Sequence, residues 1–132
     1  MDHSELKKLI NHTVNQAEYV DVINLSSVDG FTFYSYSSNK NSTEEDKLSA
    51  VSSSLISLSN AATRQLMNTT LVSTVIESTD GNMIILKTRY MGKDAVLCFI
   101  SGSKLIIGKS RYFAIKLAES ISKLSVKRLT DK

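Results

Sequence analysis

Three consecutive residues, Gly108-Lys109-Ser110, match the second half of a phosphate-binding loop. The full motif is a glycine, four residues and then Gly-Lys-Ser/Thr between a strand and a helix, which lets backbone N–H groups surround a phosphate. The first glycine is missing, because the required position is Ser103 and the nearby Gly102 lies one residue too early. The sequence therefore holds an incomplete phosphate loop, and its surroundings decide what it does.

Those surroundings favour a structural turn over nucleotide binding. Leu105, Ile106 and Ile107 fill the interior of the loop, and such bulky apolar side chains suit the edge of a core better than a backbone wrapped around phosphate. A phosphate loop also belongs to a parallel sheet with a later acidic strand end for Mg²⁺. This segment instead follows strands that are joined by short turns. An enzyme that uses Lys109 and Ser110 is kept only as a third alternative.

The other reactive residue types do not combine into a catalytic or metal-binding set. His3 and His12 are nine residues apart, with no Cys, Asp or Glu at ligand spacing. Cys98 lies in the middle of the apolar run AVLCFI, which indicates a buried structural thiol. Asp29 and Asp80 each precede a glycine, as turn-forming residues do. We therefore predict no catalytic residue, no metal site and no cofactor.

The composition is that of one soluble globular domain. The chain has 132 residues, of which 42% are hydrophobic and 22% charged, and its apolar runs are too short to span a bilayer. The first residues do not resemble a secretory signal, and a single cysteine fits a reducing compartment, so we expect a cytoplasmic protein. The net charge of +3 comes largely from a basic C-terminal tail over 125–132. No aromatic or arginine cluster accompanies that charge, so we expect no nucleic-acid partner.

Apolar residues at helical spacing predict three helices. The first covers about residues 3–16, the second about 43–67, and the third follows Ser110 as its N-cap. The first two begin with capping-box pairs, Asp2 with Glu5 and Ser42 with Glu45. The expected buried stripe of the third helix is Ala114, Leu117, Ile121 and Leu124.

Five β-type runs lie between these helices. Two of them flank Val28-Asp29-Gly30, which is a hairpin signal. The other three cover 71–78, 82–90 and 94–101 and are separated by the glycine turns at Gly81 and Gly92. Turns this short require antiparallel neighbours, because a parallel pair needs a long crossover. The expected element order is α-β-β-α-β-β-β-α in a single α+β domain.

The helix 43–67 has no ordinary solvent face, because no charge occurs between residues 48 and 63. Its larger apolar residues form a stripe that we expect to be buried: Leu48, Val51, Leu55, Leu58, Ala62 and Leu66. Small residues lie on the opposite side: Ala50, Ser54, Ser57 and Ala61. Small side chains let another helix approach closely, and a second copy of the chain is the simplest partner. The alternative is a serine-rich face that is merely exposed to water.

The chain resembles the Roadblock family, which includes dynein light chains and the bacterial MglB-type regulators of Ras-like GTPases. The resemblance covers about residues 4–124 and depends on VDGFTFYSYS, on the small-residue helix, on the three strands around Asp80-Gly81, and on LIIGKSRYFAIKLAESI. It implies a domain over 1–124, followed by the tail. The implied fold is a Roadblock-like, profilin-like sandwich, in which a five-stranded antiparallel sheet has the helix 43–67 on one face and the other two helices on the other.

The resemblance also implies homodimers that join through the helix 43–67 and the strand 71–78. The expected interface residues are Ala50, Ser53, Ser54, Ser57, Ala61, Leu71, Ser73 and Val75. The implied function is a non-enzymatic binding module for a small Ras-like GTPase, and a scaffold or adaptor without a GTPase partner is the alternative. Three arginines are conceivable contributors to GTP hydrolysis and none is favoured: Arg64, Arg89 and Arg111.

Overall fold

The predicted order of helices and strands is confirmed. A computed structural model of the protein describes residues 2–38 and 44–130, with side chains described up to residue 124. Its elements are α1 (Ser4–Ala17), β1 (Val20–Ser27), β2 (Thr32–Ser37), α2 (Glu45–Leu66), β3 (Thr74–Glu77), β4 (Gly81–Tyr90), β5 (Lys93–Gly102) and α3 (Ile107–Thr130).

The helix ends differ from the predictions in several places. The N-cap of α1 is His3, which makes no side-chain cap hydrogen bond, so the predicted capping box of Asp2 and Glu5 is wrong, although the backbone N–H of Ser4 donates to the Asp2 carboxylate at 2.9 Å. The third helix begins at Ile107, so Ser110 lies within its first turn and is not the N-cap. The same helix continues to Thr130, so most of the predicted tail is helical backbone. The predicted cap at Ser42 lies outside the described residues.

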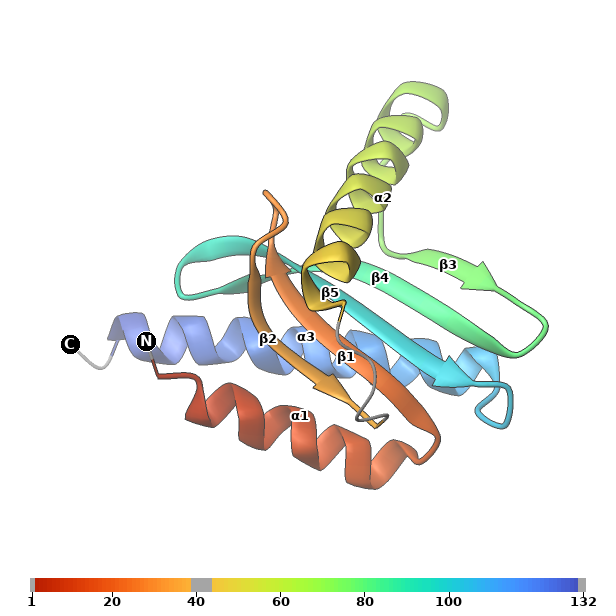
Figure 1. Ribbon diagram of the computed structural model, residues 1–132. Helices are drawn as coiled ribbons and strands as arrows, with labels where there is room; N and C mark the ends of the chain where they lie inside the picture. The colour runs from red at the N-terminus through yellow and green to blue at the C-terminus, as the bar shows by residue number, and fades with distance from the viewer. Residues whose placement is uncertain (1, 39–43, 131–132) are drawn as a thin grey trace.

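The five strands form one antiparallel sheet in the order β2-β1-β5-β4-β3. The long β5 lies at the centre, between β1 and β4, and the short β3 lies at one edge (Figure 1). Gly30 and Gly92 adopt positive φ angles of 92° and 76° in the β1–β2 and β4–β5 turns, a conformation that glycine adopts without steric cost. These turns join antiparallel neighbours, as the sequence predicts.

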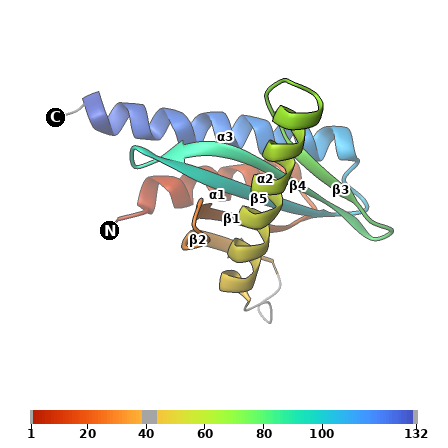
Figure 2. The ribbon, with the colours of Figure 1, turned by 90° about the horizontal axis from the view of Figure 1, so that it is seen from above.

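Helices cover both faces of the sheet, as predicted. Figures 1 and 2 show α1 and α3 side by side on one face and α2 crossing the other. Alternate side chains of β5 separate the two cores, since Leu97 and Phe99 lie in the α1/α3 core and Val96 and Cys98 lie under α2. Among the described side chains, seventeen buried residues form the α1/α3 core and only four form the α2 core. The two helical layers are therefore held by very different amounts of apolar contact.

The predicted buried stripe of α2 is wrong for four of its six residues, Val51, Leu58, Ala62 and Leu66, which are exposed. Its buried residues are Ser49, Ser52, Ser53, Ile56 and Thr63, while Leu58 is 69% exposed and Leu66 is 83% exposed. The cause is the polar surface of β1 beneath the helix. The Asn24 amide donates to the Ser49 hydroxyl at 2.9 Å, and that hydroxyl lies 2.6 Å from the Thr32 hydroxyl. Small hydroxyl residues both meet these groups and let the helix lie close to the sheet. Leu58 and Leu66 therefore face outward, whereas Leu48 and Leu55 are half-buried against the α2 core.

Two glycines provide a matched test of this fold. A Cβ at Gly81 would lie 2.4 Å from the Ser101 carbonyl oxygen, so we expect Gly81→Ala to lower the free energy of unfolding by about 1–3 kcal/mol. A Cβ at Gly108, in the first turn of α3, would meet no atom within 4 Å. Gly108→Ala should therefore raise stability by about 0.5 kcal/mol. Urea denaturation of both variants measures the difference, and equal effects would contradict it.

Candidate functional site

One residue of the incomplete phosphate loop, Ser110, takes part in packing. The Ser110 hydroxyl is buried and lies 2.6 Å from the Ser101 hydroxyl. Lys109 is exposed, and Gly108 is the second residue of α3 and has no positive φ. The Ser110 hydroxyl occupies the position of the Mg²⁺ ligand in a phosphate loop, but here it contacts Ser101 of the sheet. The prediction of a structural segment agrees with this arrangement, although Ser110 anchors the helix from inside its first turn.

His3 and Cys98 also take part in the packing of the domain. The Nδ1 atom of His3 is 2.6 Å from the Tyr90 hydroxyl, and the His3 ring contacts the rings of Tyr90 and Phe33. Cys98 is fully buried in the small core under α2, and this burial raises the pKa of its thiol to about 11. A thiol in that state is a poor nucleophile at neutral pH.

Neither a metal site nor a membrane span is found in the described part of the chain. Within the described ranges, no group of three or more His, Cys, Asp or Glu side chains lies together in a way that could hold a metal ion. The helices in those ranges also lack the length and hydropathy needed to cross a bilayer.

The distinctive surface of the molecule is apolar and runs along α2 and β3. Among the described side chains, twelve large hydrophobic residues are exposed, and seven of them lie on α2, β3 or the segment between them. We call this set the α2–β3 surface. It consists of Val51, Leu58, Leu66, Met67, Val72, Val75 and Ile76. Exposed apolar residues gathered along adjacent elements are typical of a protein interaction site.

The structure places most of the predicted interface residues on or beside this surface. Ala50, Ser54 and Ser57 are exposed and Ala61 is half-buried on the outer side of α2. Val75 is 40% exposed on β3, but it pairs with Ile84 of the α1/α3 core and so lies on the side of the sheet edge opposite α2. Leu71 and Ser73 are half-buried just before it. Ser53 is different, because it is buried beside Gly30 and its hydroxyl donates to the Ala50 carbonyl at 3.0 Å. Ser53 therefore offers almost no surface to a partner.

Sequence reasoning misses the larger apolar residues of this surface. Helical spacing assigns Leu58 and Leu66 to the core, and no pattern singles out Met67 or Val72. The only signal for their exposure is the absence of charge on α2 between residues 48 and 63. That absence indicates that the helix lacks an ordinary charged face, but it does not say which side meets the sheet.

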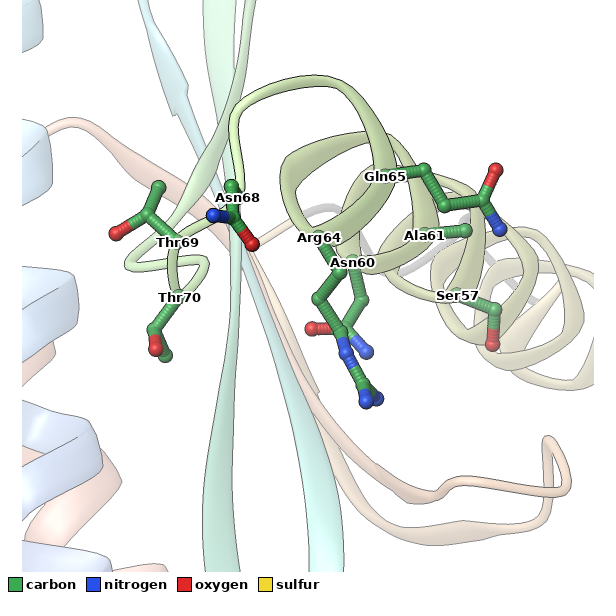
Figure 3. Close-up of a pocket in the computed structure, with 8 residues that line it drawn as sticks. All are labelled: Ser57, Asn60, Ala61, Arg64, Gln65, Asn68, Thr69 and Thr70. Carbon is green, nitrogen blue, oxygen red and sulfur yellow. The ribbon is translucent and has the colours of Figure 1, made fainter.

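A polar groove borders the α2–β3 surface. It has a volume of about 670 Å³ and lies between the second half of α2 and the segment 68–70. Figure 3 shows Arg64 and Asn60 pointing into the space between the helix and that segment, with Asn68, Thr69 and Thr70 on the far side. Ser57 and Ala61, two of the predicted interface residues, also line it. The apolar surface thus has hydrogen-bonding groups and one positive charge at its margin.

The edge of the sheet adds backbone groups to the same region. In the described sheet, β3 pairs only with β4, from Thr74 opposite Ile85 to Glu77 opposite Asn82. Its outer edge therefore carries N–H and C=O groups that no described strand meets. Glu77 is the only charged residue of this strand, although edge strands usually carry charges that discourage further pairing. The α2–β3 surface thus combines an exposed helix face with an open strand edge.

No family model and no curated protein matches this sequence. Solved structures do match the fold. A Roadblock/LC7 domain from Streptomyces avermitilis aligns over 89% of this chain and 94% of its own, with 19% identity and a TM-score of 0.74. Myxococcus xanthus MglB aligns over 94% of this chain and 97% of its own, with 13% identity and a TM-score of 0.81.

A further MglB structure, described as having a tetrameric arrangement, aligns over 95% of this chain and 90% of its own, with 13% identity and a TM-score of 0.80. At these identities the comparisons establish the fold, which is Roadblock-like as the sequence resemblance implied. The similarity extends over nearly the whole length of each chain.

The buried thiol makes a prediction about pH. The pKa of Cys98 is raised from 9.0 to about 11 in the folded chain, so the folded state holds the proton more tightly than the unfolded state. Its contribution to stability is present below pH 9 and is lost as the pH rises toward 11. We expect the free energy of unfolding to fall more steeply over this range in the wild type than in Cys98→Ala. Urea denaturation at several pH values measures both slopes, and parallel slopes would contradict the assignment.

Proposed function

We propose that this chain is a non-catalytic, homodimeric and cytoplasmic module that binds a small Ras-like GTPase. The observation that carries the proposal is the α2–β3 surface, an exposed apolar face on a 22-residue helix beside an open sheet edge. The Roadblock-like fold supports the functional class, because the resemblance of the sequence is to a family that includes regulators of such GTPases.

A second copy of the chain is the partner that best fits the α2–β3 surface. A two-fold interface brings the same surface of each copy together, so the surface must be complementary to itself. The charge-free stretch of α2 meets this condition, because its own image creates no like-charge repulsion. Ala50, Ser54 and Ala61 let two helices approach closely, while Leu58 supplies apolar contact between them. The solved MglB with a tetrameric arrangement supports assembly by a protein of this fold.

Binding of a GTPase would act by selecting one of its conformations. A protein that binds one nucleotide state more tightly shifts the GTPase toward that state without any phosphoryl chemistry of its own. Such a non-catalytic role agrees with the burial of Cys98 and with the contact between the Ser110 and Ser101 hydroxyls. The scaffold or adaptor hypothesis uses the same dimer and differs only in the partner, so nucleotide dependence distinguishes the two.

The dimer is tested by placing charges on the small-residue side of α2. We expect Ala50→Glu with Ser57→Glu to give a monomer, because a two-fold interface brings each new charge close to like charges in an apolar contact. Light scattering should report a mass of about twice 14.6 kDa for the wild type and 14.6 kDa for the variant.

The control for this experiment introduces two glutamates on the opposite face of the molecule. Asn11 and Asn15 are exposed on α1, so Asn11→Glu with Asn15→Glu should keep the dimer mass. A dimer that survives the α2 substitutions would remove α2 from the interface. A wild-type protein that is monomeric at micromolar concentration would remove the homodimer altogether.

The GTPase partner is tested by affinity capture of the full chain from its native lysate. One experiment contains GDP and the other a non-hydrolysable GTP analogue, and the retained proteins are identified by mass spectrometry. We expect a small GTPase to be enriched in only one of the two, because a regulator of this kind distinguishes the nucleotide states. Retention of the same partner other than a GTPase in both experiments would establish the scaffold hypothesis instead.

A further inference from the structure

A second exposed surface lies on the α1/α3 face of the sheet, away from α2. It is a groove of about 380 Å³ between the end of α1, the β5–α3 connection and the first turns of α3. Gln16 and Phe113 are among its lining residues. We call it the tyrosine–lysine groove and define it by Tyr19, Lys104, Leu105, Ile106, Lys109 and Tyr112.

The walls of this groove are apolar side chains that remain in water. Tyr19 is 51% exposed, Ile106 is 64% exposed and Tyr112 is 57% exposed. Leu105 is buried in the α1/α3 core and forms the floor. Tyrosines around a concave apolar floor are a composition typical of protein interfaces, since the ring gives apolar contact and the hydroxyl gives a hydrogen bond.

Lysines are held against the aromatic walls. The Lys104 ammonium lies 5.6 Å from the centre of the Tyr19 ring, and the Lys116 ammonium lies 5.6 Å from the centre of the Tyr112 ring. Lys109 is a third exposed cation, on the first turn of α3. Among the described residues, Glu18 is the only acidic one that lines the groove, and the first turn of α3 has no acidic residue. The groove is therefore positive, and the positive end of the α3 dipole adds to its potential.

The backbone that carries one wall of the groove is strained. Glu18 has φ 52° and ψ 159°, and Tyr19 has φ 55°. The Glu18 angles belong to a region that residues other than glycine rarely occupy, and such strain persists where the surrounding structure requires it. The Tyr19 carbonyl accepts a hydrogen bond from the Gly102 N–H at 3.0 Å, which holds this turn against the end of β5. The strained turn thereby fixes Tyr19 beside Lys104.

We propose that the tyrosine–lysine groove binds an acidic segment of another protein that inserts an apolar side chain between Tyr19, Ile106 and Tyr112. Charge complementarity selects this occupant, because Lys104 and Lys109 line an apolar floor with one opposing carboxylate, and Lys116 adds a positive charge beside Tyr112. A two-fold contact with a second copy would bring lysines against lysines. A membrane is a flat surface, whereas this site is concave. The proposal adds a partner to the one proposed above and uses the opposite face of the sheet.

The test uses the full chain and a defined probe, a peptide of alternating glutamate and leucine residues. We expect titration to shift the backbone amide NMR signals of residues 16–19 and 104–113, and a peptide with lysine in place of each glutamate to shift neither. Lys104→Glu with Lys109→Glu should weaken binding by about tenfold or more, since two attractive contacts become repulsive. The matched control is Lys87→Glu with Lys93→Glu, two exposed lysines elsewhere on the sheet, which should leave the affinity unchanged.

Several results would overturn the proposal. Shifts that are absent at about 1 mM peptide, a concentration that detects even weak binding, would exclude this occupant. Shifts that lie elsewhere or survive the charge reversal would do the same. Capture of phosphatidylserine vesicles by the wild type but not by Lys104→Glu with Lys109→Glu, with no peptide shifts, would identify a membrane surface instead. A dimer mass that changes in this variant would identify a self-contact, whereas an unchanged mass separates this test from that of the α2 dimer.

Discussion

The polar surface of β1 beneath α2 is the constraint on which the rest of the structure depends. Asn24 is fully buried on this face of the sheet, and a buried polar group is costly unless it has a hydrogen-bonding partner. The helix above it supplies Ser49, whose hydroxyl accepts a hydrogen bond from the Asn24 amide nitrogen. Because α2 turns serines toward the sheet, larger apolar residues such as Leu58 and Leu66 are exposed on its outer side. The exposed apolar face of α2 is thus a consequence of what lies under it.

The unequal cores extend this argument to the whole domain. The α1/α3 core contains most of the buried apolar residues and supplies most of the hydrophobic stabilisation. The α2 core contains Ile56, Ile85, Val96 and Cys98, and α2 runs on beyond it to Leu66 (Figure 1). A long helix with little apolar contact beneath it is stabilised when a further surface covers it from outside. The small core under α2 therefore weakens the attachment of the helix in one copy and makes the helix suitable for packing against another copy.

Periodicity predicts the helices, the strands and their order along the chain, because each depends on local patterns and on short turns, whereas the two layers are predicted by the family resemblance. Periodicity cannot predict which side of α2 is buried. A stripe that includes Leu58 and Leu66 normally faces a core, but the Asn24 amide on β1 meets Ser49, and these two leucines lie on the outer side. The predicted Ser110 cap is wrong for a similar reason, since its hydroxyl is bound by Ser101 across the turn. The tyrosine–lysine groove joins three separate segments and has no signature in any one of them.

The pairing of β1 with β5 also governs how fast the domain can form. Val20 pairs with Ser101, so the centre of the sheet joins two strands that are far apart in the sequence. Pairings between residues so distant in sequence form slowly, because a long loop must close first. The β3–β4–β5 meander consists of local contacts, so we expect it to form faster than the central ladder. Closure of β1 onto β5 is therefore the step that we expect to set the folding rate.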